Sequence, residues 1–185
     1  YMISRLQNGD AFEIALAEFL YCHGEFDPFH QDTDRVDVLQ IRAETGVRVA
    51  AARALRDAET NAEYALRGLE QLVRRMAPLP GQRQIVVVSP GFLTASREYR
   101  KSEIADRALR MNVAINALDA KGVFAPLHFG GVDRRLPSVP MVAGRKDQLR
   151  RSGYDRDLDI LRELAWDTGG EFFQNSNNFD EGFRK

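Results

Sequence analysis

The segment that most constrains the fold is a short run of β-branched apolar residues that ends at a proline and a glycine. Gln84–Val88 reads Gln-Ile-Val-Val-Val, and Ser89-Pro90-Gly91-Phe92 follows it. A run of this length and composition is typical of a buried parallel strand. Pro90 has no N–H for a ladder hydrogen bond and Gly91 tolerates a positive φ, so the chain should leave the sheet there. Ligands of open α/β sheets bind where such strands end, which makes Ser89, Pro90, Gly91 and Phe92 candidate binding residues.

The segments after this strand alternate between helical and extended patterns. The elements predicted in order are a strand at 84–88, a helix with apolar positions from Ile104 to Leu118, a strand at 123–127, a helix from Asp155 or Asp157, and a strand at 171–174. This order predicts an α/β fold, part of a doubly wound, Rossmann-like parallel sheet with flanking helices.

The first 81 residues form a helical region by their apolar periodicity, and residues 82–185 form the α/β region. We expect one helix at 11–21, capped by Asp10 with Glu13, and after a loop one long helix at about 34–76. A break near Gly46 would be consistent with the low helix propensity of glycine. The large apolar residues of the later half of the long helix should pack on the sheet or on another helix; they are Leu66, Leu69, Leu72, Val73 and Met76.

The composition excludes several function classes. The 26 basic and 27 acidic residues give a net charge of −1, which argues against a dedicated nucleic-acid binder. No apolar run approaches the ~18–20 residues of a membrane helix. The single cysteine, Cys22, allows no internal disulfide. The first residue is Tyr1, which leaves room for a segment upstream.

Two groups of residues could bind a charged ligand. Residues 130–151 show no periodicity and read as an exposed loop that could hold an acidic partner or a phosphate, although a solvated loop is favoured; its basic residues are Arg134, Arg135, Arg145, Lys146, Arg150 and Arg151. A metal-ligand set is conceivable near the N-terminus, but no zinc-ligand spacing is met and a polar loop is favoured there; its members are Cys22, His23, His30, Asp32 and Asp34.

Catalytic chemistry receives little support from the residues. A nucleophile elbow requires Gly-x-Ser-x-Gly, whereas Ser89 stands in Val-Val-Ser-Pro-Gly, so we expect a structural turn serine. Asp106 and Asp119 are expected on the surface of a helix, and Asp167 at a helix end, with no defined pairing for acid–base work. Trp166 is expected to be buried or half-buried. Of Phe172 and Phe173, one should lie in the core and the other under the long helix.

Three stretches in this order resemble the second half of a von Willebrand factor A domain. They are Arg83–Phe92, Asn116–Phe124 and Leu161–Phe173, the last with a helix followed by Thr-Gly-Gly and an aromatic strand. The chain is more similar still to the VWFA-related family described from Acidobacteria. The matching pieces are Leu-Pro-Gly-Gln-Arg before the Ser-Pro-Gly-Phe strand, Ile-Ala-Asp-Arg-Ala before Asn-Ala-Leu-Asp-Ala, and Gly-Gly-Glu-Phe-Phe before Asp-Glu-Gly-Phe.

This resemblance implies a non-enzymatic protein-binding module that contacts its partner at the carboxyl ends of the strands. The Asp-x-Ser-x-Ser string of the family's magnesium site does not occur here, so we expect no bound metal and no cofactor. Two alternatives stay open: a metal-dependent adhesion domain whose Asp-x-Ser-x-Ser lies upstream of Tyr1, and a serine hydrolase using Ser89. An extracytoplasmic location is implied by the resemblance alone.

A sheet of three strands should have an edge that another segment must cover. Only three strands are recognisable, and the strand at 84–88 is apolar on both faces. Such a strand should have a neighbouring strand on each side, because a long unpaired edge promotes pairing with another chain. We therefore expect an upstream half, the long helix or a second copy of the chain to cover the edge.

Overall fold

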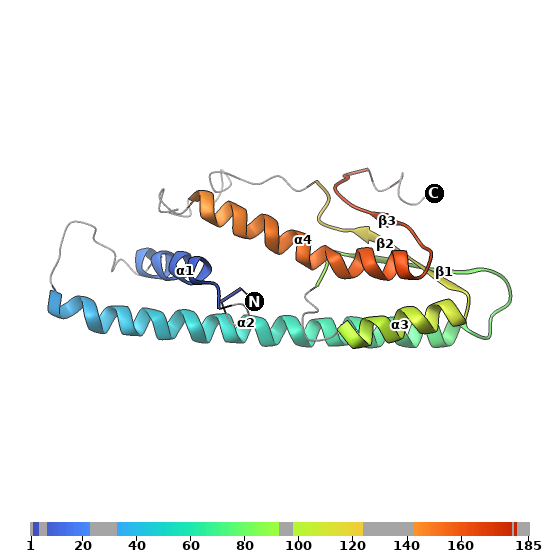
Figure 1. Cartoon of the computed structure of the whole chain (residues 1–185), viewed down its shortest axis with the longest axis horizontal. Coiled ribbons are helices and arrows are strands. Elements are labelled where there is room, and N and C mark those ends of the chain that lie inside the picture. The colour runs from blue at the N-terminus through green and yellow to red at the C-terminus, as the bar shows by residue number, and fades with distance from the viewer. Residues whose placement is uncertain are drawn as a thin grey trace. The chain divides into compact units, whose positions relative to one another are not determined.

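Four helices and three strands lie in the part of the chain that the computed structural model describes, which is residues 2–3, 7–22, 33–92, 98–123, 143–178 and 180 (Figure 1). In chain order they are α1 (Gly9–Cys22), α2 (Thr33–Met76), β1 (Arg83–Ser89), α3 (Glu98–Arg110), β2 (Val113–Asp119), α4 (Ala143–Asp167) and β3 (Phe172–Phe173). The α/β class is thereby confirmed. None of the helices in these ranges is long and apolar enough to cross a membrane.

The chain divides into two compact units. Unit 1 comprises residues 1–57 and 126–152, and unit 2 comprises residues 58–125 and 153–185. Helices α2 and α4 each contribute residues to both units. The sheet and the carboxyl ends of its strands belong to unit 2.

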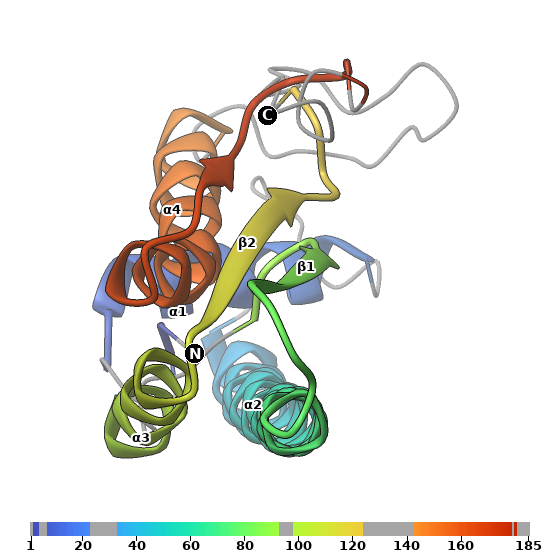
Figure 2. The same ribbon diagram turned by 90° about the vertical axis from the view of Figure 1, so that its right-hand side faces the viewer.

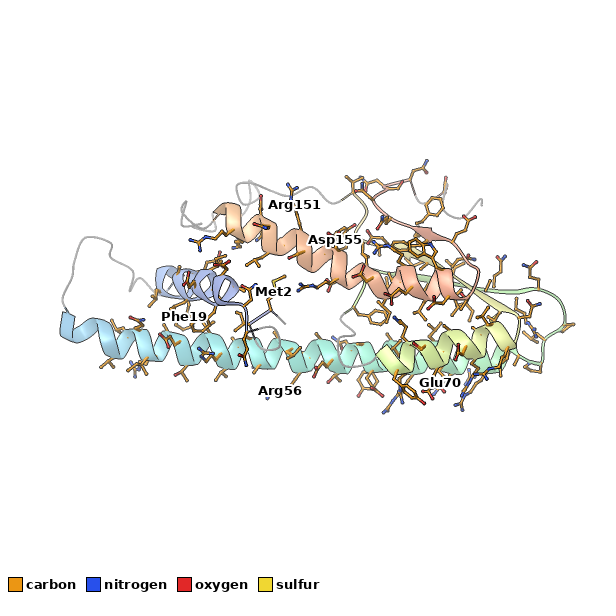
Figure 3. The ribbon with its side chains drawn as sticks, viewed as in Figure 1. Met2, Phe19, Arg56, Glu70, Arg151 and Asp155 are labelled. Carbon is orange, nitrogen blue, oxygen red and sulfur yellow. The ribbon has the colours of Figure 1, made fainter. Side chains whose placement is uncertain are left out.

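In unit 1, α1 packs beside the first part of α2. Asn8 caps α1, since its Oδ1 accepts the Ala11 N–H at 2.9 Å, so the predicted cap at Asp10 was wrong. Gly46 does not break α2. A Cβ at Gly46 would lie 3.1 Å from the ring of Phe19 (Figure 3), so the glycine allows this ring of α1 to approach the helix closely.

Helix α4 begins at Ala143, so the prediction of a loop through residue 151 was wrong. Arg145, Lys146, Arg150 and Arg151 all lie in its first turns, and Arg151 is labelled in Figure 3. Basic residues near a helix N-terminus are unfavourable to the helix dipole. Acidic residues of α1 compensate for this: Arg145 lies 3.3 Å from Asp10 and 3.6 Å from Glu13, and Lys146 pairs with Glu18. Arg134 and Arg135 lie outside the described residues.

In unit 2, the three strands are parallel and lie in the order β1-β2-β3 (Figure 2). One face of the sheet packs on α2, α3 and α4. The buried cluster there combines alternate strand residues with one stripe from each helix; it contains Ile85, Val113, Ile115, Ala117, Leu66, Leu69, Val73, Ile104, Ala105, Ala108, Leu158, Leu161, Leu164 and Ala165. Leu66, Leu69, Val73 and Met76 thus pack as predicted, whereas Leu72 is 48% exposed and that expectation was wrong.

The boundary between α3 and β2 corrects the sequence analysis. Residues 113–118 were predicted to continue a helix, but α3 ends at Arg110 and β2 runs from Val113 to Asp119. Asn112 has φ +51°, and its N–H donates to the Leu109 carbonyl, which ends the helix with a left-handed residue. Val113, Ile115 and Ala117 then alternate inward as a strand requires. Val123 is not in a strand, and residues 124–127 of the predicted strand lie outside the description.

Ion pairs join α2 and α3. Glu63 accepts hydrogen bonds from Arg67 and Arg100, and Glu70 (Figure 3) accepts from Arg74 and Arg107, all at 2.6–2.9 Å. Burial by itself would raise the pKa of Glu70. The hydrogen bond from Arg74 and the charges of the surrounding arginines outweigh burial and hold that pKa below its ordinary value.

Candidate functional site

The Ser89–Phe92 turn at the carboxyl end of β1 is fixed in place by α4. Gly91 has φ +84°, and a Cβ there would lie 2.2 Å from the Asp157 carbonyl oxygen, so only glycine fits. The Phe92 N–H donates to that same oxygen at 3.0 Å. The Ser89 Oγ accepts the Gly91 N–H at 3.1 Å, as in a structural serine turn. The turn predicted from the sequence is thus present, with Pro90 exposed at its tip.

Asp119 lies beside this turn and was missed as a site residue. Its position pairs with Ser89 in the β1–β2 register, and its side chain is only 1% exposed. The prediction of a helix-surface position was therefore wrong, because residues 113–119 form a strand rather than a helix. Asp106 does lie on the exposed surface of α3, and Asp167 ends α4, as expected.

Both carboxylate oxygens of Asp119 accept hydrogen bonds. Oδ1 accepts the Lys121 backbone N–H at 2.8 Å, and Oδ2 accepts the hydroxyl of Tyr154 on α4. A buried carboxylate is tolerated when its oxygens are paired in this way. Asp119 and Tyr154 therefore tie the end of β2 to α4, as the Phe92 N–H ties the turn after β1.

The Lys121 side chain contacts both Asp157 and Tyr154. Its Nζ lies 3.1 Å from Asp157 Oδ2 and 4.9 Å from the centre of the Tyr154 ring. Burial raises the pKa of Tyr154 well above its ordinary value, and the hydrogen bond to Asp119 and the negative charges of Asp119 and Asp155 add to the effect. The phenol thus stays protonated and keeps donating to Asp119 at neutral pH.

This interaction predicts a loss of stability at alkaline pH that depends on Tyr154. The protonated phenol is favoured in the folded state, so its contribution is complete below the unfolded pKa of about 10 and is lost as pH rises from there towards the folded pKa. The free energy of unfolding in urea, measured from pH 8 upward, should fall more steeply above about pH 10 in the wild type than in Tyr154→Phe. Parallel curves across that range would mean that the hydroxyl does not bond the carboxylate in solution.

The residues at this edge do not fit a magnesium ion. Mg²⁺ requires several oxygen ligands in near-octahedral geometry. Asp119 has both oxygens engaged, Asp157 pairs with the Lys121 ammonium, and Pro90 offers only a carbonyl. Across the described residues, no group of three or more His, Cys, Asp or Glu side chains is placed to hold a metal.

Titration of the protein with magnesium, followed by calorimetry, is therefore expected to give no heat beyond dilution. The reason is that a cation at this edge would have to displace the Tyr154 hydroxyl or meet the Lys121 ammonium. Binding at millimolar or tighter affinity that Ser89→Ala or Asp119→Asn abolishes would contradict this expectation.

The other residues singled out from the sequence either lie apart from this edge of the sheet or fall outside the residues that the structure describes. His23, His30 and Asp32 lie outside the described residues, as does His128. Of Cys22 and Asp34 only the backbone is placed, at helix ends. Trp166 was predicted to be buried but is 66% exposed, because it lies about 100° around α4 from the buried Ala165. Phe172 packs against the core.

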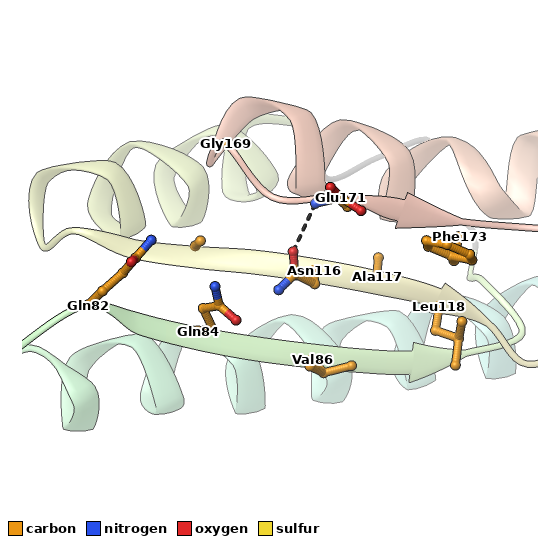
Figure 4. Close-up of a pocket in the computed structure, with 10 residues that line it drawn as sticks. Gln82, Gln84, Val86, Asn116, Ala117, Leu118, Gly169, Glu171 and Phe173 are labelled. Carbon is orange, nitrogen blue, oxygen red and sulfur yellow. Dashed lines mark hydrogen bonds between the residues drawn. The ribbon is translucent and has the colours of Figure 1, made fainter. Parts of the chain in front are cut away.

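A shallow hollow of about 210 Å³ lies on the face of the sheet opposite the buried cluster (Figure 4). The carboxamides of Gln82, Gln84 and Asn116 line one part, and Val86 and Phe173 line another. The Asn116 Oδ1 accepts the Glu171 N–H at 2.8 Å, which holds the chain entering β3 against β2. This volume is below the ~300–1,000 Å³ of typical small-molecule pockets. We therefore interpret the hollow as part of the exposed surface of the sheet and not as a ligand site.

Comparison of the chain with protein-family models, with curated proteins and with solved structures finds no match in any of the three.

Proposed function

We propose that this chain is a non-enzymatic protein-binding module, similar to the second half of a von Willebrand factor A domain, that contacts its partner at the carboxyl ends of β1 and β2. The resemblance to the VWFA-related family supplies the expected location of the contact. The parallel order β1-β2-β3, with α3 and α4 as crossovers, is compatible with that fold.

The observation that carries the proposal is the fixed position of the Ser89–Phe92 turn. Its backbone is held to α4 by the Phe92 N–H, which donates to the Asp157 carbonyl, and to the end of β2 by the Ala120 N–H, which donates to the Ser89 carbonyl at 3.0 Å. A turn held in this way loses little conformational freedom on binding, which favours affinity. Pro90 is exposed at its tip and Val88 is 55% exposed beside it, so the turn offers apolar surface to a partner.

Binding at this edge is proposed to need no metal. In metal-dependent A domains the ion bridges the domain and its partner. Here the only buried carboxylate at the edge among the described residues, Asp119, supports Tyr154 and the Lys121 backbone instead. We expect the turn to contact the partner directly.

Photo-crosslinking in an extract of the native cell tests the proposal. A photoreactive amino acid at position 90 should give one major adduct with a distinct protein. The matched control is the same amino acid at Gln71, which is exposed on α2 in the same unit and should give none. Excess purified wild-type protein should compete the adduct away. Equal adducts at both positions, or none at position 90, would overturn the proposal.

A further inference from the structure

The two ends of α4 are anchored in different ways. Every residue from Gly144 to Gly153 is exposed or half-buried, and Leu158 is the first buried one among the described side chains of this helix. From that position onward the core of unit 2 holds the helix through side chains that are at most 1% exposed; they are Leu158, Ile160, Leu161, Leu164 and Ala165. A segment with few buried apolar contacts opens at a low free-energy cost. Residues 143–152 therefore depend on contacts outside that core.

The sequence of residues 143–152 is a poor helix by itself. Glycine has a low helix propensity, and this part of α4 contains Gly144 and is followed by Gly153. Ser152-Gly153 is the kind of pair at which helices bend, and the boundary between the two compact units falls between these two residues. The segment carries four basic residues, with no acidic residue in the first turn, so its charge opposes the helix dipole. A helix this short is marginal in water without such support.

Helix α1 supplies ion pairs to this part of α4. Arg145 lies 3.3 Å from Asp10 and 3.6 Å from Glu13. Lys146 pairs with Glu18, and these two side chains are only 23% and 30% exposed, so this pair is partly protected from solvent. α1 contains three acidic residues and no basic one, and all three pair with α4. The charge of α1 is thus complementary to that of the segment it contacts.

We propose that residues 143–152 are a conditional helix, which forms while α1 is paired with it and opens when those pairs break, and that this opening loosens Tyr154. In an α-helix each N–H donates to the carbonyl four residues earlier, so the Tyr154 N–H depends on Arg150. The Tyr154 side chain packs on the core and donates to Asp119, which makes it the first anchor after the conditional helix.

Ionic strength sets the population of the open form, because salt screens ion pairs that are partly exposed. α1 thereby regulates how firmly Asp119 is held beside the Ser89–Phe92 turn. The consequence for partner binding rests on the proposed function, whereas the opening itself does not.

Amide hydrogen exchange in the full chain tests the conditional helix. Glu18→Gln removes one acidic partner and does not weaken α1, because Glu18 lies in the later half of α1, where a carboxylate opposes the helix dipole. Exchange of amides 147–152 should rise by roughly fivefold, the upper end of what an exposed ion pair is worth, and amides 161–167 should not change. Glu44→Gln is the matched control, since that carboxylate accepts from Gln40 within α2. Equal effects of the two substitutions, or no rise with Glu18→Gln, would overturn the proposal.

A second pair of amides tests the link to Tyr154. The Lys121 N–H donates to Asp119, and the Ala120 N–H donates to the Ser89 carbonyl. In Glu18→Gln the exchange of the Lys121 amide should rise together with that of amides 147–152, whereas the Ala120 amide should not change. Raising the salt concentration from about 0.05 M to about 0.5 M should reproduce both rises in the wild type. A conditional helix that opens while the Lys121 amide stays unchanged would contradict the link.

Discussion

Gly170→Ala is expected to destabilise the protein by about 3 kcal/mol, at the upper end of the cost of overpacking. A Cβ at this position would lie 2.1 Å from the Ile115 carbonyl oxygen and 2.9 Å from Asn116 Oδ1. The first of these is backbone in the central strand and cannot rotate away. The Gly170 N–H also donates to the Ala165 carbonyl at 2.8 Å, so the residue cannot move outward without losing that bond. Urea denaturation followed by circular dichroism measures the loss.

Gly68→Ala is the matched control for that measurement. Gly68 lies within α2 in the same unit, and a Cβ there would meet nothing within 4 Å. Because alanine has the higher helix propensity, this substitution should stabilise the protein by about 0.5–1 kcal/mol. Similar effects of the two substitutions would mean that the backbone at Gly170, before β3, does not lie as close to β2 at Ile115.

Arg83→Met is expected to cost about 3 kcal/mol, because one guanidinium serves the ends of two helices. Its Nη1 donates to the carbonyls of Ala77 and Leu79 at 2.6 and 2.7 Å, after the end of α2. Its Nη2 donates to the Met111 carbonyl after the end of α3. Methionine keeps the apolar stem and removes every donor, so these carbonyls lose their partner. The free energy of unfolding in urea gives the measurement.

Two further variants separate geometry from charge. Arg83→Lys should recover only part of the loss, since a compact ammonium cannot reach both helix ends as a planar fork does. Arg110→Met removes an arginine whose side chain is 77% exposed and should change stability by less than about 0.5 kcal/mol. Full rescue by lysine would show that position 83 needs only a positive charge.

The sequence predicted β1 and its turn well because composition alone specifies them. Four β-branched residues in a row, Ile85 to Val88, favour a strand, and Pro90 and Gly91 end it. The same reasoning failed at residues 113–118, where Val113, Ile115 and Leu118 fit a helical stripe as well as a strand. Asn112 was the missed signal, since an asparagine after a helical run often takes the left-handed conformation that ends it.

The candidate site was only half predictable for a different reason. Ser89–Phe92 is a local pattern, whereas the Asp119–Tyr154 pair joins residues 35 positions apart. Such a contact depends on where α4 begins and how it packs. The first turns of α4 in turn depend on ion pairs with α1, more than a hundred residues earlier, which no local pattern reveals.

We propose that the Ser89–Phe92 turn binds a protein partner directly, without a divalent metal. The most direct test is the yield of the position-90 photo-adduct in cell extract, measured in excess EDTA and in excess magnesium. The same yield is expected in both, because the Asp119 carboxylate accepts hydrogen bonds from the Tyr154 hydroxyl and the Lys121 N–H and is not available to a cation. An adduct that disappears in EDTA and returns with magnesium would contradict the claim and favour a metal-dependent adhesion domain.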